Sequence, residues 1–301
     1  MARFKIFGAL SRTQIVCRVA ATLLALLLLL QAVYLLAVKP DDGVLYVHVL
    51  DVGQSDAILL RCGDLVMLID TGTATEQEAL QTALLYYGVS KIDYLVLTHL
   101  HEDHIGNARY LLSQYAVEQV LLPRATGEEL AATLLCEVLA EGGVPVTVAE
   151  PLAEFSFGAA ACQILYAPTL ENSADLNNES LVLRIAFGEN SLLFMGDGEE
   201  PLEQRLLAST DAALLDCDFL KVGHHGAKAS TCSAFLAAVT PRYAAISCGK
   251  NNSHGFPHAD TLARLSAVGA EIHRTDDGGT LSFCCDGTTI ISMREGGVAY
   301  A

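Results

Sequence analysis

Three histidines and one aspartate lie within six residues, in the segment 98–106, which has the sequence Thr-His-Leu-His-Glu-Asp-His-Ile-Gly. Imidazole nitrogens and carboxylate oxygens are the ligands that zinc and similar divalent ions bind in hydrolytic sites. No other segment of the chain has these groups at such density. We therefore predict a metal centre here, rather than a surface loop that is merely rich in histidine.

The spacing of these ligands predicts places for two ions. Residues 94–97 are an apolar run, which is typical of a buried strand. On an extended segment His99 and His101 point the same way and could share one ion. Asp103 and His104 lie where the chain is expected to turn into a helix, which suits a second ion. Two ions about 3.5–4 Å apart can clamp the attacking and leaving oxygens of a displacement.

Further candidate ligands follow predicted strands later in the chain. Asp197 lies between two glycines after an apolar run, and we predict that it bridges the two ions. A helix N-cap is the alternative for this residue. His224 and His225 precede a glycine at a predicted strand end, and we expect one of them to be a ligand. Asp70 also ends a predicted strand and is expected to orient a histidine ring through a hydrogen bond.

Polar residues near these ligands could contact a substrate. Lys228, Ser230 and Thr231 follow the histidine pair and are placed to touch a phosphate, although Lys228 could equally be a solvated surface lysine. His254 and His258 flank Gly-Phe-Pro at 255–257, and either could enter the site.

The apolar periodicity predicts where helices and strands position these residues. Strands are expected at 45–50, 57–60, 65–69, 92–97, 117–122, 144–148, 162–166, 180–187, 191–195, 219–222 and 243–248, with more at the C-terminal end. Helices are expected at 76–87, 105–115, 128–141, 199–208, 233–239 and 259–267. The strands form two groups with accompanying helices, which predicts one α+β domain of two packed sheets over 45–301.

The N-terminal part of the chain has the pattern of a membrane anchor. Residues 19–38 contain no charged side chain, and about 20 such residues span a bilayer as a helix. Basic residues precede this segment and no acid occurs before Asp41. We expect residues 1–18 in the cytoplasm, a transmembrane helix over 19–38, a linker over 39–44 and an extracellular domain after it, in a single-pass cell membrane protein. A cleaved signal peptide is the alternative.

The expected extracellular part is strongly acidic. Five of the 18 basic residues lie before residue 40, whereas all 35 acidic residues lie after it. The chain after residue 39 therefore has 13 basic residues and a net charge of about −22. Such a surface repels polyanions at long range, which counts against tight non-specific binding of nucleic acid.

The nine cysteines form no CxxC pair, so they do not indicate a zinc ribbon. Most lie in apolar surroundings, where a free thiol behaves as a small hydrophobic group. We expect mostly buried thiols, and the disulfide state stays open.

Taken together, these motifs resemble the metallo-β-lactamase superfamily, whose hallmark is an HxHxDH loop. More specifically, they resemble the soluble C-terminal domain of ComEC-type competence proteins. The segments that carry this resemblance are 51–57, 68–72, 98–106, 177–183, 194–197 and 220–226. It covers about residues 45–294 and implies an αββα sandwich. It also implies one ion on His99, His101 and Asp197, and another on Asp103, His104, Asp197 and one of His224 and His225.

Several positions depart from the family pattern. Many members supply a third histidine to the first ion, but no histidine occurs here between His104 and His224. Residues 177–180 stand near where that ligand would come. Asn178 is therefore predicted as a catalytic residue, and Asn177 and Ser180 as residues that support the ligands or contact the substrate. Asp51, from the first motif, is a further candidate for such a supporting or substrate role. The family's Gly-His-Pro motif has Phe256 in place of histidine. Full-length competence proteins have a many-helix DNA channel, which we do not expect the one predicted transmembrane helix to form alone.

The resemblance implies a metal-dependent hydrolase of the ComEC-like type, a phosphodiesterase or nuclease, and the N-terminal segment predicts that it is membrane-anchored and extracytoplasmic. It would use hydroxide activated by two divalent ions, zinc first and manganese as the alternative, with Asp103 relaying a proton. The expected substrate is DNA or a cell-wall polymer, without a small organic cofactor, and the oligomeric state is left open. The alternatives are a teichoic-acid or phosphocholine esterase, or a non-catalytic module that binds DNA or the wall. A lactam or lactone substrate fits less well.

Overall fold

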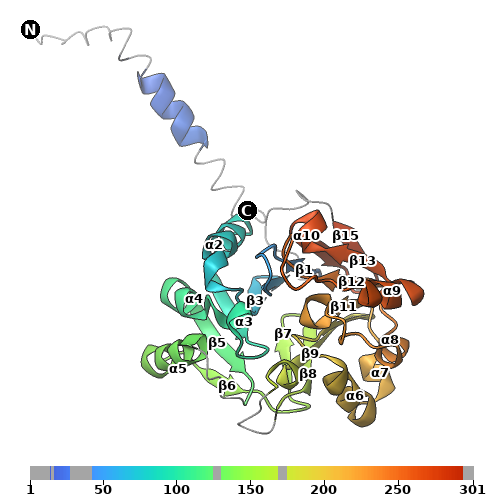
Figure 1. Cartoon of the computed structure of the whole chain (residues 1–301). Coiled ribbons are helices and arrows are strands. Elements are labelled where there is room, and N and C mark those ends of the chain that lie inside the picture. The colour runs from blue at the N-terminus through green and yellow to red at the C-terminus, as the bar shows by residue number, and fades with distance from the viewer. Residues whose placement is uncertain (1–13, 15–16, 28–42, 125–129, 169–174, 294–301) are drawn as a thin grey trace, which may run out of the picture. The chain divides into compact units, whose positions relative to one another are not determined.

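The computed structural model describes residues 14, 17–27, 43–124, 130–168 and 175–293 (Figure 1). Contacts divide the chain into two units, Met1–Lys39 and Pro40–Tyr300. In the smaller unit residues 17–27 are helical. The rest of the predicted span 19–38 lies outside the described residues. Within the described part of the chain, we find no helix whose length and apolar character would allow it to cross a membrane.

The larger unit contains two sheets. In spatial order the first sheet consists of β15 (Ile290–Met293), β14 (Leu281–Cys285), β1 (Leu45–Val49), β2 (Ile58–Cys62), β3 (Leu65–Ile69), β4 (Lys91–Val96), β5 (Ala116–Leu122) and β6 (Val146–Val148). The second sheet consists of β13 (Glu271–Arg274), β12 (Tyr243–Ile246), β11 (Phe219–Lys221), β10 (Asn190–Phe194), β9 (Val182–Phe187), β8 (Ala160–Tyr166) and β7 (Glu154–Phe157).

The helices lie on the outer faces of the sheets, as Figure 1 shows. They are α2 (Gln77–Tyr86), α3 (Glu102–Ile105), α4 (Ala108–Gln114), α5 (Leu130–Gly142), α6 (Glu200–Ser209), α7 (Ala212–Leu215), α8 (Ser233–Val239), α9 (Ala259–Ala267) and α10 (Thr275–Gly278). One buried cluster joins α2, α4 and α5 to the first sheet, and another joins α6, α8 and α9 to the second.

A third buried cluster fills the space between the sheets. Its centre includes Phe219, whose ring lies 5.8 Å from Phe194 and 5.0 Å from Phe283, so that aromatic rings of both sheets meet. Along the strand that leads to the histidine loop, Tyr94 and Val96 pack in this central cluster. Leu95, between them, packs against the helices. Both faces of β4 are buried, which explains its nearly continuous apolar sequence. The predicted α+β sandwich of two sheets is confirmed.

Parallel pairing brings the predicted ligands to one edge of the sandwich. Strand β3 pairs parallel with β4, and β11 pairs parallel with both β10 and β12. The carboxyl ends of parallel neighbours lie at the same edge of a sheet. Residues that follow β3, β4, β10, β11 and β12 are therefore neighbours although they are far apart in the sequence.

The helix expected over 105–115 is two helices, α3 and α4, that meet at Gly106 and Asn107. The Asn107 amide donates to the carbonyls of Thr71 and Thr73, at 2.9 and 2.7 Å. A Cβ on Gly106 would lie 2.5 Å from the backbone nitrogen of Ala74. The chain is thus tied to the segment after β3, and this close approach interrupts the helix. Strand β7 and helix α7 are additional elements that the sequence pattern did not predict.

All nine cysteines lie in the described part of the chain and are free thiols, five of them buried. This agrees with the expectation of mostly buried thiols.

Candidate metal centre

Four predicted ligands form a compact group at this edge. Ligand atoms of Asp103, His104, Asp197 and His225 all lie within 4.8 Å of one another. His104 Nε2 is 3.2 Å from Asp197 Oδ1, and His225 Nε2 is 3.3 Å from Asp103 Oδ2. His225 Nε2 also lies 3.7 Å from Asp197 Oδ2. Two nitrogens and two carboxylates at this spacing form a donor set that suits a divalent ion.

A second pair of predicted ligands lies on the other side of Asp197. His99 Nε2 is 3.0 Å from His101 Nδ1, and it is 4.0 Å from Asp197 Oδ2. His99 is buried, whereas His101 is partly exposed. Asp197 Oδ2 therefore faces both the pair His99 and His101 and the ring of His225. The structure brings together the residues for which the sequence predicted two ion sites.

Two buried atoms of the compact group have no hydrogen-bond partner in the described part of the chain, namely His104 Nε2 and Asp197 Oδ1. A buried polar atom left without a partner costs about 1–3 kcal/mol. Because these two atoms face each other across 3.2 Å, one bound cation would satisfy both. The residues present therefore fit a divalent metal.

The electrostatics of the group also favour a cation. Burial alone would lower the pKa of His104, but Asp197 and Asp70 raise it well above its ordinary value. For His225, burial is likewise opposed by Asp197 and Asp56, which raise its pKa to about 10. Burial lowers the pKa of His99 well below its ordinary range, which favours the neutral form of the ring that binds a metal. Carboxylates that stabilise protonated rings would stabilise a metal ion in the same place.

Asp70 orients the His104 ring. Thr98 donates to the Asp70 carboxylate from its backbone nitrogen at 2.8 Å and from Oγ1 at 2.7 Å. His104 Nδ1 lies 2.8 Å from Asp70 Oδ2. With Nδ1 engaged, Nε2 faces Asp197, which is the arrangement of a carboxylate that supports a metal-binding histidine. Asp70 is buried and lies behind the ligands, in agreement with the role expected from the sequence.

The His225 ring is fixed from behind by residues for which the sequence suggested no role. Its Nδ1 lies 2.9 Å from the Ser247 carbonyl and 3.4 Å from Asp56 Oδ1. The other Asp56 oxygen accepts a 2.6 Å hydrogen bond from the Lys221 ammonium. One signal for Lys221 was available, because a lysine within an apolar strand must find a buried counter-charge.

His224 has different surroundings from its neighbour. Its Nδ1 lies 2.8 Å from Glu199 Oε1, its Nε2 lies 3.8 Å from Asp197 Oδ2, and the Asn177 amide is 3.5 Å from the ring. His224 and His225 both have positive φ, 44° and 51°. Non-glycine residues adopt this region at a cost of about 1–3 kcal/mol each, and such residues cluster at functional sites. The strained turn directs the two successive rings toward Asp197 from different positions.

Two polar residues of the segment 177–180 support the site through the backbone. Ser180 Oγ accepts a hydrogen bond from the Asp197 nitrogen at 3.1 Å. The Asn178 side-chain oxygen accepts from the nitrogens of Glu199 and Leu202, at 3.0 and 3.2 Å, and so caps α6. Asn178, predicted as a catalytic residue, is thus engaged at a helix end.

The structure does not bring every predicted substrate residue to the metal group. Lys228 has a side chain that is 70% exposed and pairs with Asp260 at 3.5 Å. Ser230 is buried and donates to the Ala227 carbonyl. His258 Nδ1 accepts from the Asp260 nitrogen and caps α9. Asp51 lines a neighbouring pocket.

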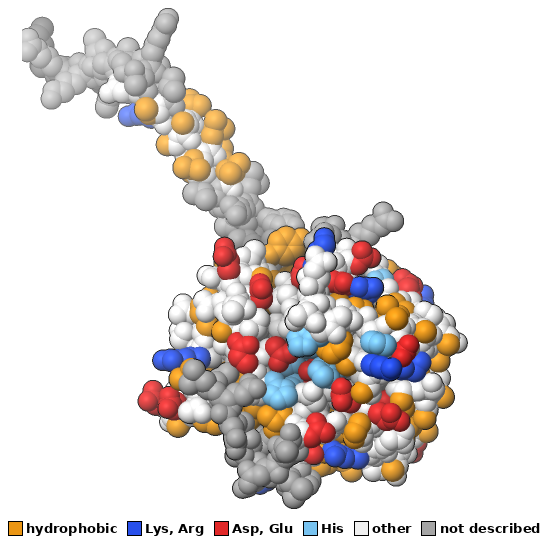
Figure 2. All heavy atoms as spheres, viewed as in Figure 1, with side chains coloured by type: hydrophobic (Ala, Val, Ile, Leu, Met, Phe, Trp, Pro, Cys, Tyr) orange, Lys and Arg blue, Asp and Glu red, His pale blue; other side chains and the backbone are white. Residues whose placement is uncertain are grey.

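A pocket of about 530 Å³ opens over the ligands. Figure 2 shows histidine and acidic side chains gathered near the middle of the face in view. The pocket is lined by Gln54, Thr73, Thr75, Glu76, His101, Glu102, Asp103, His224, His225, His254 and Phe256. Of the two late histidines, His254 reaches this pocket.

Comparison with known proteins agrees with this geometry. Residues 50–250 match the profile of the metallo-beta-lactamase superfamily. The chain belongs to that superfamily. It is 30% identical over 255 residues to "ComE operon protein 3" of Bacillus subtilis, and 30% identical over 249 residues to "Competence protein ComA" of Neisseria gonorrhoeae. Each alignment covers 79% of this chain and 32% of the relative, so the chain spans about a third of their length.

Solved structures share the fold of this superfamily member. The metallo-beta-lactamase fold protein YhfI from Bacillus subtilis aligns with a TM-score of 0.56 at 13% identity, over 79% of this chain and 99% of that one. CmlA, a diiron beta-hydroxylase from Streptomyces venezuelae, aligns with a TM-score of 0.51 at 17% identity, over 76% of this chain and 52% of that one. The superfamily member described here is a metal-dependent hydrolase of the metallo-β-lactamase fold, related to competence proteins.

Proposed function

We propose that this domain hydrolyses phosphodiesters with the help of two divalent metal ions. His99, His101 and Asp197 would hold one ion, and Asp103, His104, Asp197 and His225 the other. Zinc is the first choice because of the nitrogen-rich ligand set, and manganese is the alternative. Such ions supply an acidified water as nucleophile and neutralise the non-bridging oxygens of a phosphate.

One observation carries this proposal, namely the position of Asp197 between two groups of ligands. Its Oδ1 faces His104 at 3.2 Å, while its Oδ2 faces His99 at 4.0 Å and His225 at 3.7 Å. A carboxylate with ligands on both sides is what a bridge between two ions requires. Glycine at position 196, with a φ of 54°, lets the backbone before Asp197 pass close to Ser180. A Cβ at this position would lie only 2.8 Å from the Ser180 side chain.

The residues that line the pocket have separate roles in this proposal. The Asp103 side chain is 34% exposed, so it can exchange a proton with a bound substrate and with water. Glu102, beside it, accepts hydrogen bonds from Thr73 Oγ1 and the Ala74 nitrogen, and its carboxylate therefore stays on the pocket wall. Asp103, which also belongs to the compact ligand group, is therefore the acidic side chain that we propose to move a proton.

DNA is the leading substrate class within this proposal, since the relatives of similar sequence bear the names of competence proteins. The net charge of about −22 after residue 39 disfavours a long polyanion that lies across the surface. Single strands that enter the pocket with few phosphates fit this charge better than duplex DNA does. A cell-wall phosphodiester polymer is the alternative polyanion.

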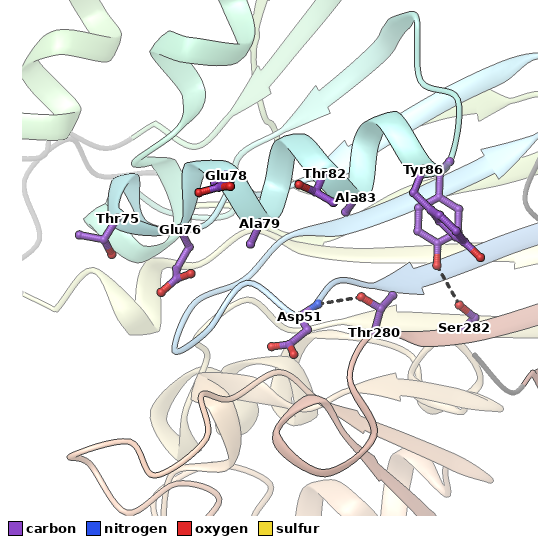
Figure 3. Close-up of a pocket in the computed structure, with 11 residues that line it drawn as sticks. Asp51, Thr75, Glu76, Glu78, Ala79, Thr82, Ala83, Tyr86, Thr280 and Ser282 are labelled. Carbon is purple, nitrogen blue, oxygen red and sulfur yellow. Dashed lines mark hydrogen bonds between the residues drawn. The ribbon is translucent and has the colours of Figure 1, made fainter. Parts of the chain in front are cut away.

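A phosphocholine or similar cationic ester is a second candidate substrate, favoured by a neighbouring pocket of about 800 Å³. Figure 3 shows this pocket between α2 and the strand end that carries Thr280. Its lining includes Asp51, Glu78 and Tyr86, and it shares Thr75 and Glu76 with the pocket over the metal ligands. Carboxylates beside an aromatic ring suit an organic cation.

The proposal includes the N-terminal anchor. Residues 19–38 lack charge and follow a basic segment, which supports a single-pass membrane protein with the hydrolase domain outside the cell. Determination of the N-terminal residue of the mature protein tests this part. A mature chain that begins near Val38 would identify a cleaved signal peptide instead.

Metal analysis combined with activity assays tests the proposed reaction. The purified full chain is expected to contain about two zinc or manganese ions, as for two-metal sites of this kind. It is expected to hydrolyse bis-p-nitrophenyl phosphate and one of two specific substrates, single-stranded DNA or a phosphocholine ester. Metal-loaded protein that is inert on all three substrates would refute the phosphodiesterase.

A further inference from the structure

Two stacked rings lie on the rim of the pocket over the metal ligands. His254 and Phe256, from the loop between β12 and α9, have ring centroids 5.4 Å apart and planes 23° apart. Both residues line the pocket, His254 exposed and Phe256 half-buried. The Phe256 ring in turn meets the His224 ring edge to face at 5.4 Å. A row of three rings thus leads from solvent to the histidine that faces Asp197.

The loop that carries these rings is fixed before any ligand binds. The Asn252 amide donates to the carbonyls of Gly249 and Phe256, at 2.9 and 2.6 Å, and its side-chain oxygen accepts from the Phe256 nitrogen. The Gly249 nitrogen donates to Gln54 Oε1 at 2.9 Å, which joins the loop to another residue that lines the pocket. Contacts with a fixed loop cost less ordering entropy on binding than contacts with a mobile one.

The other wall of the pocket differs in charge. Glu76 and Glu102 line it, and Glu102 is held there by its hydrogen bonds to Thr73 and Ala74. Phe256 is the one apolar side chain among the described residues that line this pocket. An anionic substrate with a planar group would therefore place that group against His254 and Phe256. Its further phosphates would stay away from the carboxylates of Glu76 and Glu102.

We propose that the His254 and Phe256 rings form a stacking platform for a nucleobase whose phosphodiester lies at the metal centre. His254 is the ring that contacts the base, and Phe256 is a positioning residue beneath it. Because every base has a planar face, the platform accepts single strands with little dependence on sequence. The inference rests on the proposed phosphodiesterase and names single-stranded nucleic acid as its substrate class.

The test compares oligonucleotides that carry either a base or an abasic sugar next to the cleaved phosphate. The zinc-loaded full chain should cleave the base-bearing strand about tenfold faster in kcat/KM, as expected for one stacked base. His254→Ala should reduce this ratio to near one, whereas His254→Phe should keep it, because phenylalanine supplies a ring without a proton to donate. Ser253→Ala is the matched control, since Ser253 is exposed in the same loop and is not among the residues that line the pocket.

A binding measurement gives a readout that is independent of catalysis. A strand with 2-aminopurine beside a cleavage-resistant phosphorothioate should lose fluorescence on binding wild-type protein, and should lose much less with His254→Ala. Phe256→Leu should weaken this quenching as well, because it removes the support of the His254 ring.

Each outcome has a defined meaning. An equal rate on base-bearing and abasic strands, together with quenching that is insensitive to His254, overturns the platform while the phosphodiesterase stands. The same holds for hydrolysis of bis-p-nitrophenyl phosphate without cleavage of any oligonucleotide. Quenching that depends on His254 without hydrolysis of any substrate supports the platform and refutes the proposed reaction. Absence of both hydrolysis and quenching overturns both.

Discussion

The Lys221 ammonium donates a 2.6 Å hydrogen bond to Asp56 Oδ2, and neither side chain is reached by solvent. Lys221 ends β11 in the second sheet, and Asp56 precedes β2 in the first. The pair therefore joins the two sheets directly behind the metal ligands, where Asp56 Oδ1 also faces His225. Burial alone would raise the pKa of Asp56, but the charge of Lys221 and the neighbouring rings of His225 and His104 hold it below its usual value.

Removal of the lysine should destabilise the fold. Lys221→Met leaves the Asp56 carboxylate buried without its counter-charge, which costs about 3–5 kcal/mol in comparable buried pairs. Urea denaturation of the metal-free protein measures this loss. The double variant Lys221→Met, Asp56→Asn has no unpaired charge at this buried position. Its free energy of unfolding should therefore recover at least half of what Lys221→Met loses. If the double variant loses as much free energy of unfolding as the two single variants added together, the two residues are not coupled.

The ion pair of Lys221 and Asp56 could not be predicted from the sequence. The motif around Asp56 and the strand containing Lys221 are both recognisable, yet no spacing rule connects residues 165 positions apart. The connection depends on how the two sheets pack. In contrast, His99, His101, Asp103 and His104 are predictable as a group because one loop carries them all.

The architecture was predictable because it depends on local pattern. Apolar runs and turn residues locate most strands and helices, and their two groups indicate two sheets. The position of Asp70 was also predictable, since a carboxylate at a strand end beside the histidine loop has few other roles. Lys228 and Asn178 were different, because a sequence does not show which way a loop side chain turns. The structure engages one with Asp260 and the other at the start of α6.

Asp70 should control how tightly the metal binds. Asp70→Asn replaces one of the two carboxylate oxygens by an NH2 group, so a single oxygen cannot accept all three hydrogen bonds from the Thr98 nitrogen, Thr98 Oγ1 and His104 Nδ1. Loss of such a supporting carboxylate typically weakens metal affinity about 10–100-fold. Competition with a chromogenic chelator measures the change.

A matched control separates this effect from general destabilisation. Asp93→Asn alters another buried aspartate, which accepts from the Val66 nitrogen and pairs with Lys91 at 2.6 Å, away from the metal ligands. It should leave the metal affinity unchanged. Equal metal affinity in Asp70→Asn and wild type would contradict the role of Asp70.

The two adjacent histidines should differ in their effect on metal content. His225 belongs to the compact group with Asp103 and His104, so His225→Ala should lose about one ion per chain, the second ion of a two-metal site. His224→Ala should retain both ions, because His224 is not among the four residues whose ligand atoms form the compact group. Elemental analysis of the dialysed proteins distinguishes the two variants. The opposite order of metal loss would assign the second ion to His224.

His48 should make the fold sensitive to acid. Burial and, to a smaller extent, the charge of Arg61 lower its pKa from 6.5 to about 3. The ring stacks on Tyr87 at a centroid distance of 4.0 Å, and its Nδ1 lies 2.8 Å from Ser282 Oγ. The folded state keeps this ring neutral, whereas the unfolded chain binds a proton below pH 6.5. The stability from this residue is therefore complete above pH 6.5 and is lost as the pH falls toward 3.

The expected loss between pH 7.5 and pH 5 is about 2 kcal/mol in the free energy of unfolding. Denaturant titrations at both pH values, with metal removed, measure it. His48→Gln should be less stable than wild type at pH 7.5 but should lack this share of the acid sensitivity. His273→Gln, a change in another strand histidine that pairs with Glu271 at 2.9 Å, is the matched control and should retain it. If wild type and His48→Gln lose the same free energy on acidification, the ring of His48 is not the buried group that responds to pH.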